Sequence, residues 1–287
     1  MPQADIRETL ERIEHLPTLP VVAQQVLTLL ADRRSNMNQV AAVIARDQAI
    51  SARVIRLVNS AFYGLRTSVS SIQHAIVILG LNSVKNLVLG VSVVTTFEDT
   101  ARTSIFDREQ FWMHTFATAL GARRIAQELK RAEPEDYFLA GLLHDMGILA
   151  MDQFLHDTFV EILETTVDGE NDLLAAEQQV LGTGHGDVGA FLGTKWRVPR
   201  FLIDTMRYHH TPERLPVESK VSRDKVAVVH AADARSREAG IGTFVENFMV
   251  SYHDATLQSL GIGESRLKEM FEEVKKEAGG LIREWGL

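Results

Sequence analysis

Apolar residues recur every three or four positions through most of the chain, a spacing typical of helices that bury one face. The clearest examples lie near the two ends of the sequence. Their apolar positions are Leu19, Val22, Val26, Leu29 and Leu30, then Ile50, Val54, Leu57 and Val58, and finally Leu267, Met270, Phe271 and Val274. The alternation that would indicate strands is weak. The pattern therefore predicts an all-α fold.

Capping residues place several helix boundaries. Ser70, with Gln73 three residues later, predicts a capping box at the start of a helix. Gly80 predicts the end of that helix, with a new helix directly after it. A long helix is expected over Asp107–Lys130. Val226–Val229 is the best strand candidate, but the alanines around it favour a helix.

The most polar break in the chain is Phe97–Asp107, and it predicts a boundary between two parts. Residues 1–100 would form an N-terminal helical lobe. Residues 101–287 would form a second helical bundle that ends in an amphipathic helix. Of the ten histidines only His15 and His74 precede the break. Chemistry is therefore expected in the second part, and packing and recognition in the first.

Composition excludes several classes of site. The 287 residues include no cysteine, so any metal must be held by nitrogen and oxygen ligands. The net charge of −8 argues against nucleic acid as a partner, because backbone binding needs a basic face. The longest apolar stretch, Leu87–Val94, is far too short to span a membrane. With no secretory pattern at the N-terminus, the expected location is the cytoplasm.

Histidines and aspartates from five segments are candidate metal ligands, because helical bundles build metal sites from inward-facing side chains. They are His114, His144, Asp145, His185, His209, His210 and Asp233. Imidazole and carboxylate suit iron, manganese, zinc and nickel, and discriminate poorly among them. Adjacent residues lie about 100° apart on a helix, so His144 and Asp145 could reach one cavity, with Asp145 bridging two ions. Gly147 would relieve crowding or end the turn.

Each candidate also has a purely structural interpretation. A single histidine on a helix is more often exposed or hydrogen-bonded in a core than bound to metal. His209 and His210 could form a solvated helix end. His230 could be a local partner of Asp233. His156 and His253 are expected at the surface, and Trp112 and Trp196 in the core.

The order of these residues resembles a known family. GLLHDMG at 141–147, preceded by WMHTFATALGARRIA and followed by HGDVGAFLGTKWRVP, YHH and HAADA, resembles the HD superfamily of metal-dependent phosphohydrolases. LPTLP at 16–20, DQAISARVIRLVNSAFYG at 47–64 and SIQHAIVILGLNSVKNLVLG at 71–90 are similar to its HDOD branch, the HD-related output domain of bacterial signalling proteins.

The resemblance implies an N-terminal helical lobe packed on an HD-like bundle, and a regulatory module that often lacks catalysis. It also implies ligand sets for one or two divalent ions, with iron or manganese preferred and zinc or nickel as alternatives. The first set would be His114, His144, Asp145 and Asp233, and the second His185, His209 and His210. Asn59-Ser60-Ala61 resembles the family's turn between helices, a structural feature.

Two departures from hydrolytic relatives bear on activity. Those relatives place a phosphate-facing lysine directly after the HD-x-G motif, where this chain has Ile148. The cyclic-dinucleotide phosphodiesterases follow their paired histidines with an acidic residue and a Gly-Tyr-Pro element, where this chain reads HHTPERLP.

Three functions remain open from the sequence. The first is a signalling module that contacts other signalling proteins and holds a metal for structure or sensing. The second is a phosphohydrolase acting on a nucleotide or another phosphoester, in which Asp145 is catalytic. The third is a metal-free helical scaffold. Ile148 favours the first and the full ligand set favours the second.

Overall fold

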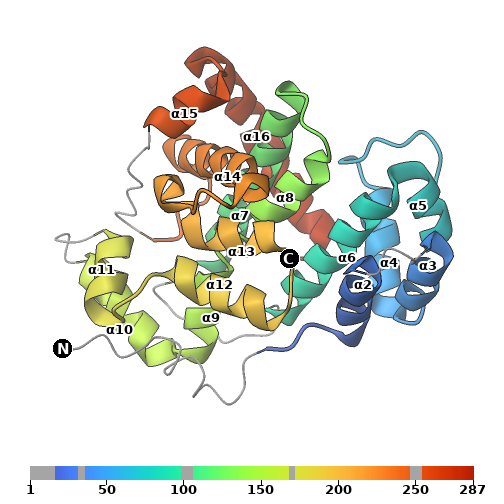
Figure 1. Ribbon diagram of the computed structural model, residues 1–287, viewed down its shortest axis with the longest axis horizontal. Coiled ribbons are helices and arrows are strands. Elements are labelled where there is room, and N and C mark those ends of the chain that lie inside the picture. The colour runs from blue at the N-terminus through green and yellow to red at the C-terminus, as the bar shows by residue number, and fades with distance from the viewer. Residues whose placement is uncertain (1–16, 32–35, 98–105, 168–171, 246–253) are drawn as a thin grey trace. The chain divides into compact units, whose positions relative to one another are not determined.

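The computed structural model describes residues 17–31, 36–97, 106–167, 172–245 and 254–287. Every regular element in these ranges is a helix, which confirms the predicted all-α fold (Figure 1). The chain divides into two compact units. The described part of the small unit lies within residues 17–99 and 279–287, and that of the large unit within residues 100–278. Most of the predicted break at Phe97–Asp107 lies outside the described residues.

Five helices build most of the small unit: α2 (Val21–Ala31), α3 (Met37–Ile44), α4 (Gln48–Val58), α5 (Ile72–Leu79) and α6 (Leu81–Thr96). α6 packs against α2, α4 and α5. The predicted stripe of α4 is buried, as expected. Asn59 ties the segment after α4 in place: its side-chain amide donates to Val69 O and its Oδ1 accepts from Val69 N, both at 2.7 Å. These bonds support a structural role for the 59–61 turn.

The start of α5 corrects one prediction. The N-cap is Ser71, whose hydroxyl accepts from His74 N at 3.1 Å, and the expected capping box of Ser70 and Gln73 does not form. A start at Ile72 buries Ile72 together with the rest of the apolar face, which decides the register. Gly80 separates α5 from α6 as predicted, because its φ of 86° suits glycine.

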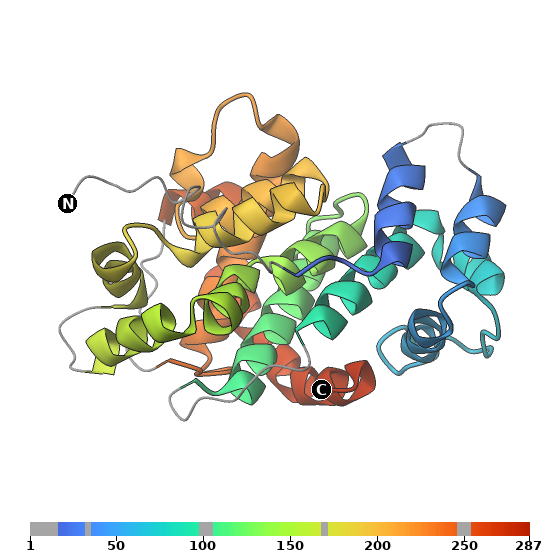
Figure 2. The ribbon, with the colours of Figure 1, turned by 90° about the horizontal axis from the view of Figure 1, so that it is seen from below.

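In the large unit, α8 and α14 lie against the long helix α7 (Figures 1 and 2). α12 packs between α13 and α9. Asp107 caps α7 by accepting from Gln110 N, and α7 fills almost the whole predicted range. The bounds are α7 (Arg108–Glu128), α8 (Pro134–Leu143), α9 (Met146–Phe154), α10 (His156–Val167), α11 (Leu173–Val180), α12 (His185–Lys195), α13 (Arg200–Tyr208), η1 (Pro212–Arg214), α14 (Lys220–Glu238), α15 (Asp254–Leu260) and α16 (Glu264–Trp285).

Side-chain burial agrees with most single-residue expectations. Trp112 and Trp196 are buried in the core. The stripe of α16, from Leu267 to Val274, is buried as predicted. The strand candidate around Val226–Val229 lies inside α14. His156 is exposed, whereas His253 lies outside the described residues.

Among the described residues, no single helix has both the length and the apolar character needed to cross a membrane. Pro134–Phe154 and His156–Thr166 meet the requirement only as a pair, and the pair is bent by 114°. Most of α8 and α9 is buried within the protein.

Candidate metal centre

All seven predicted ligands converge inside the large unit. Six of the seven side chains are fully buried, and the seventh, His210, is 8% exposed. They come from different helices, so no short segment could build this cluster alone. His114 lies in α7, His144 and Asp145 between α8 and α9, His185 at the start of α12, His209 and His210 at the end of α13, and Asp233 in α14.

One local expectation is corrected, and one structural alternative is excluded. His144 and Asp145 do not share one helix, because His144 ends α8 and Asp145 precedes α9 with φ −99° and ψ 14°. The chain turns at this junction, and both side chains face the same centre. His209 and His210 are not a solvated helix end, since His209 is fully buried and His210 nearly so.

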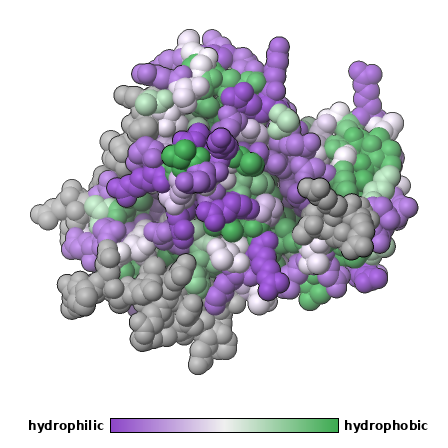
Figure 3. Space-filling model, in the orientation of Figure 1, coloured by the Kyte–Doolittle hydropathy of each residue, from purple (hydrophilic) through white to green (hydrophobic). Residues whose placement is uncertain are grey.

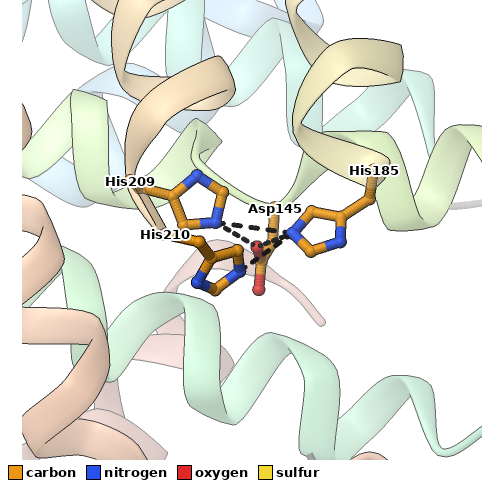
Figure 4. A group of neighbouring side chains, drawn as sticks. All are labelled: Asp145, His185, His209 and His210. Atoms are coloured by element: carbon orange, nitrogen blue, oxygen red, sulfur yellow. Dashed lines mark hydrogen bonds and ion pairs between the residues drawn. The ribbon is translucent and has the colours of Figure 1, made fainter. Parts of the chain in front are cut away.

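The potential ligand atoms form two groups. We call Asp145, His185, His209 and His210 the His185 group, and His114, His144 and Asp233 the His114 group. Within each group, the ligand atoms all lie within 4.8 Å of one another. Figure 4 shows the three imidazoles of the His185 group directed at the carboxylate of Asp145.

Spacing in the His185 group matches a metal coordination shell. Asp145 Oδ1 lies 3.2 Å from His185 Nε2 and 3.1 Å from His209 Nε2. His185 Nε2 lies 3.4 Å from His209 Nε2 and 3.1 Å from His210 Nε2. With metal–ligand bonds of about 2.1 Å, neighbouring ligands in octahedral or tetrahedral geometry are about 3.0–3.4 Å apart. Asp145 Oδ1 is buried and hydrogen-bonds to none of the described residues, so it fits a cation.

The outer nitrogen of three of the rings, His144, His185 and His209, is held by an acceptor. Nδ1 of His144 donates to Gly141 O at 2.6 Å, and Nδ1 of His209 donates to Met206 O at 2.9 Å. Nδ1 of His185 donates to Glu177 Oε1 at 2.8 Å. A carbonyl or carboxylate oxygen only accepts, so Nδ1 carries a proton and Nε2 faces the cluster. Metal-ligating histidines are oriented in this way.

Asp145 faces both groups. Its Oδ1 faces the His185 group, while its Oδ2 lies 3.1 Å from His144 Nε2 and 3.8 Å from His114 Nε2. In the His114 group, Asp233 Oδ1 lies 2.9 Å from His114 Nε2 and 3.8 Å from His144 Nε2. This geometry fits the expectation that Asp145 can serve two positions.

Three neighbouring residues support the cluster, and two of them were not identified from the sequence. Buried Glu177 in α11 accepts from Nδ1 and from the backbone N of His185. Arg237 in α14 donates to Asp233 Oδ1 at 2.8 Å and to Asp145 Oδ2 at 3.2 Å. His230 donates from Nδ1 to His209 O at 2.7 Å. This bond joins residues twenty-one positions apart and gives His230 a structural role, but it is not the local partnership with Asp233 that the sequence suggested.

Burial and neighbouring charges shift the pKa values of the side chains in the cluster. Burial opposes ionisation of Asp145, but the facing histidines, His144 foremost, hold its pKa well below the usual range. Burial also opposes ionisation of Asp233, and Arg237 most strongly holds its pKa well below the usual range. Burial favours neutral His144 and His185, yet Asp145 raises the pKa of His144 to about 9 and Glu177 raises that of His185 to about 10. Burial lowers the pKa of His114 to about 4.

These directions predict that loading a divalent ion into either group releases about one proton. His144 in one group and His185 in the other carry a second proton at pH 7.5, since their pKa values are about 9 and about 10. A ligating histidine must be neutral, so the ion displaces that proton. Affinity should rise about tenfold per pH unit for each displaced proton until pH exceeds these pKa values. Calorimetric titration of ion-free protein in two buffers of different ionisation enthalpy measures the number of protons released per ion bound. Loading without proton release would contradict this expectation.

Comparison with known sequences identifies the family. The HDOD domain profile matches residues 16–212. The chain belongs to the HDOD family. This range covers helices α2 to α6 and six of the seven candidate ligands. Asp233 lies beyond it.

Solved structures share the fold. An HDOD domain protein of unknown function from Geobacter sulfurreducens is 26% identical, with a TM-score of 0.76 over 98% of this chain and 94% of that one. A candidate signal transduction protein from Marinobacter aquaeolei VT8 is 23% identical, with a TM-score of 0.74 over 100% of this chain and 62% of that one. A candidate phosphohydrolase from Shewanella amazonensis SB2B is 23% identical, with a TM-score of 0.64 over 92% and 97%.

The curated relatives are longer proteins. A Treponema pallidum protein is 25% identical over 211 residues, which is 73% of this chain and 40% of that protein. The HDOD chain described here thus spans less than half the length of this relative.

Proposed function

We propose that this HDOD protein is a regulatory module that acts by contacting other signalling proteins, and that its His/Asp cluster binds a divalent cation which stabilises the bundle. The observation that carries the proposal is the closure of the cluster. A catalytic metal needs an open coordination position that substrate can reach. Here six of the seven candidate side chains have no exposed surface.

The side chains that could bind a phosphate near the cluster give further support. Ile148, at the position of the phosphate-facing lysine in hydrolytic relatives, is fully buried and uncharged. Arg237 does reach the cluster, but its guanidinium hydrogen-bonds to the carboxylates of Asp145 and Asp233. A phosphoester could bind the Arg237 guanidinium only by displacing one of these hydrogen bonds.

Exposed apolar side chains in the small unit are candidates for the protein contact. Val77 and Ile78 on α5 are 67% and 43% exposed, and Met37, 44% exposed, lies on α3, which packs against α5. A hydrophobic area is visible over α5 in Figure 3. Contiguous exposed apolar surface commonly marks an interaction site.

Replacing Val77 and Ile78 together by glutamate is expected to remove bound partner proteins without destabilising the fold. Both side chains are exposed, so the free energy of unfolding should change by less than about 0.5 kcal/mol per substitution. The measurement is quantitative mass spectrometry of proteins crosslinked to the tagged chain in its own host. The control pair is Val217→Glu with Val221→Glu, at 74% and 77% exposure in the large unit. Identical partners for both variant pairs would contradict the proposal.

The alternative is a metal-dependent phosphohydrolase acting on a nucleotide or another phosphoester, with Asp145 in the catalytic site. The full set of candidate ligands favours it. Turnover of cyclic di-GMP or a nitrophenyl phosphodiester by manganese- or iron-loaded protein at about 1 s⁻¹, an ordinary enzyme rate, would reverse the ranking.

A further inference from the structure

The two groups of candidate ligands differ in their distance from Arg237, which lies beside the His114 group. Its Nε donates to Asp233 Oδ1, and its Nη2 donates to Asp145 Oδ2. Both oxygens belong to the side of the cluster that faces His114 and His144. The guanidinium also lies over the ring of Phe244, 5.4 Å from its centroid, and is 13% exposed. On this side of the cluster a permanent cation therefore already lies against Asp233 Oδ1 and Asp145 Oδ2, the two carboxylate oxygens that face His114 and His144.

The His185 group has a different environment. Asp145 Oδ1 points at Nε2 of His185 and of His209, and none of the described residues donates a hydrogen bond to it. Glu177, behind His185, adds a second buried carboxylate. Three imidazoles and one carboxylate oxygen make a cation site here, with four of their separations at 3.1–3.4 Å and all of them within 4.8 Å. The negative charge around it is only partly balanced by Arg237.

Resting on the proposal that the cluster binds metal, we infer that it binds one divalent ion, in the His185 group, and that Arg237 takes the place of a second ion. Buried charge must be compensated. With the imidazoles neutral, the carboxylates of Asp145, Asp233 and Glu177 and the guanidinium of Arg237 leave two negative charges, which one divalent ion neutralises. Two ions would leave two positive charges in the core, or one with a bridging hydroxide. The second ion would also lie close to the guanidinium, which repels it.

The test is the number of ions per chain, measured by elemental analysis after loading with excess Mn²⁺ and desalting. Wild-type protein is expected to hold one ion. Arg237→Met removes the internal cation, and the variant should hold two ions that give a coupled electron paramagnetic resonance signal. The matched control is Arg235→Met. Arg235 is also a poorly exposed arginine of α14, but it pairs with Glu238 and Glu264 outside the cluster. This control should hold one ion.

A second pair of variants locates the ion without relying on Arg237→Met to fold. His209→Ala should abolish binding, whereas His114→Ala should retain one ion. The inference is overturned by two ions in the wild type, by one ion in folded Arg237→Met, or by loss of the ion in His114→Ala but not in His209→Ala. No ion in the wild type at saturating Mn²⁺ would overturn the metal site itself, so the two failures are distinguishable.

Discussion

Removing the divalent ion is expected to lower the melting temperature by ~8–16 °C. An ion that binds only the folded chain stabilises it by about 4 kcal/mol at a thousandfold excess over its Kd. A change of 1 kcal/mol shifts the melting temperature of a domain of this size by about 2–4 °C. The ligands come from five separate segments, so the unfolded chain cannot reproduce the site. Differential scanning calorimetry with and without chelator measures the shift.

Asp145→Ala should erase this dependence on the ion. Asp145 supplies the only carboxylate oxygen of the His185 group and also faces His144. The control is Asp152→Ala, which removes another buried aspartate of the same region, one that pairs with Arg108 outside the cluster. That variant should melt lower but keep the full shift with chelator. A chelator-independent wild type, first shown to carry no trapped ion, would instead favour the metal-free scaffold.

The helical fold could be predicted because its causes are local. The period of apolar positions, the cap at Asp107 and the break at Gly80 act within a few residues of one another. The wrong prediction of a capping box at Ser70 is also local, because the observed N-cap is the next residue. Two adjacent serines can each cap a helix, and burial of Ile72 against the rest of the small unit decides between them. Tertiary packing therefore determines which of the two serines caps the helix, and the sequence pattern reports this packing only indirectly.

The candidate ligands were identifiable because histidine and aspartate are few and carry recognisable chemistry. Glu177 and Arg237 were missed because their residue types are common on helix surfaces. Their role depends on contacts across the fold: Glu177 with His185 eight residues away, and Arg237 with Asp145, ninety-two residues away. A weak local signal did exist for Arg237, since it lies four residues after Asp233 on the same helix. The choice between one ion and two also depends on Arg237.

Gly147 shows how closely the backbone must approach to form this cluster, and Gly147→Ala is expected to destabilise the large unit by at least about 4 kcal/mol. A Cβ at Gly147 would lie 1.9 Å from the carbonyl O of His185 and 2.9 Å from the backbone N of Gly189. Both neighbours are backbone atoms of α12, so no side chain can rotate away. The start of α9 would have to move from α12, which separates Asp145 from His185. The sequence offered two reasons for this glycine, and the structure supports the relief of crowding.

The expected loss of stability in Gly147→Ala is opposite in sign to the effect of an ordinary glycine-to-alanine substitution in a helix. Alanine is favoured over glycine by about 1 kcal/mol in a helix interior. Gly280→Ala in α16 is the control, because a Cβ there meets nothing within 4 Å, and it should be neutral or stabilising. Urea denaturation with and without Mn²⁺ measures both variants. Gly147→Ala should lose stability and its response to Mn²⁺ together, because α9 and α12 hold ligands of the same ion. A Gly147→Ala protein as stable and as metal-responsive as wild type would show that α9 and α12 do not pack this closely.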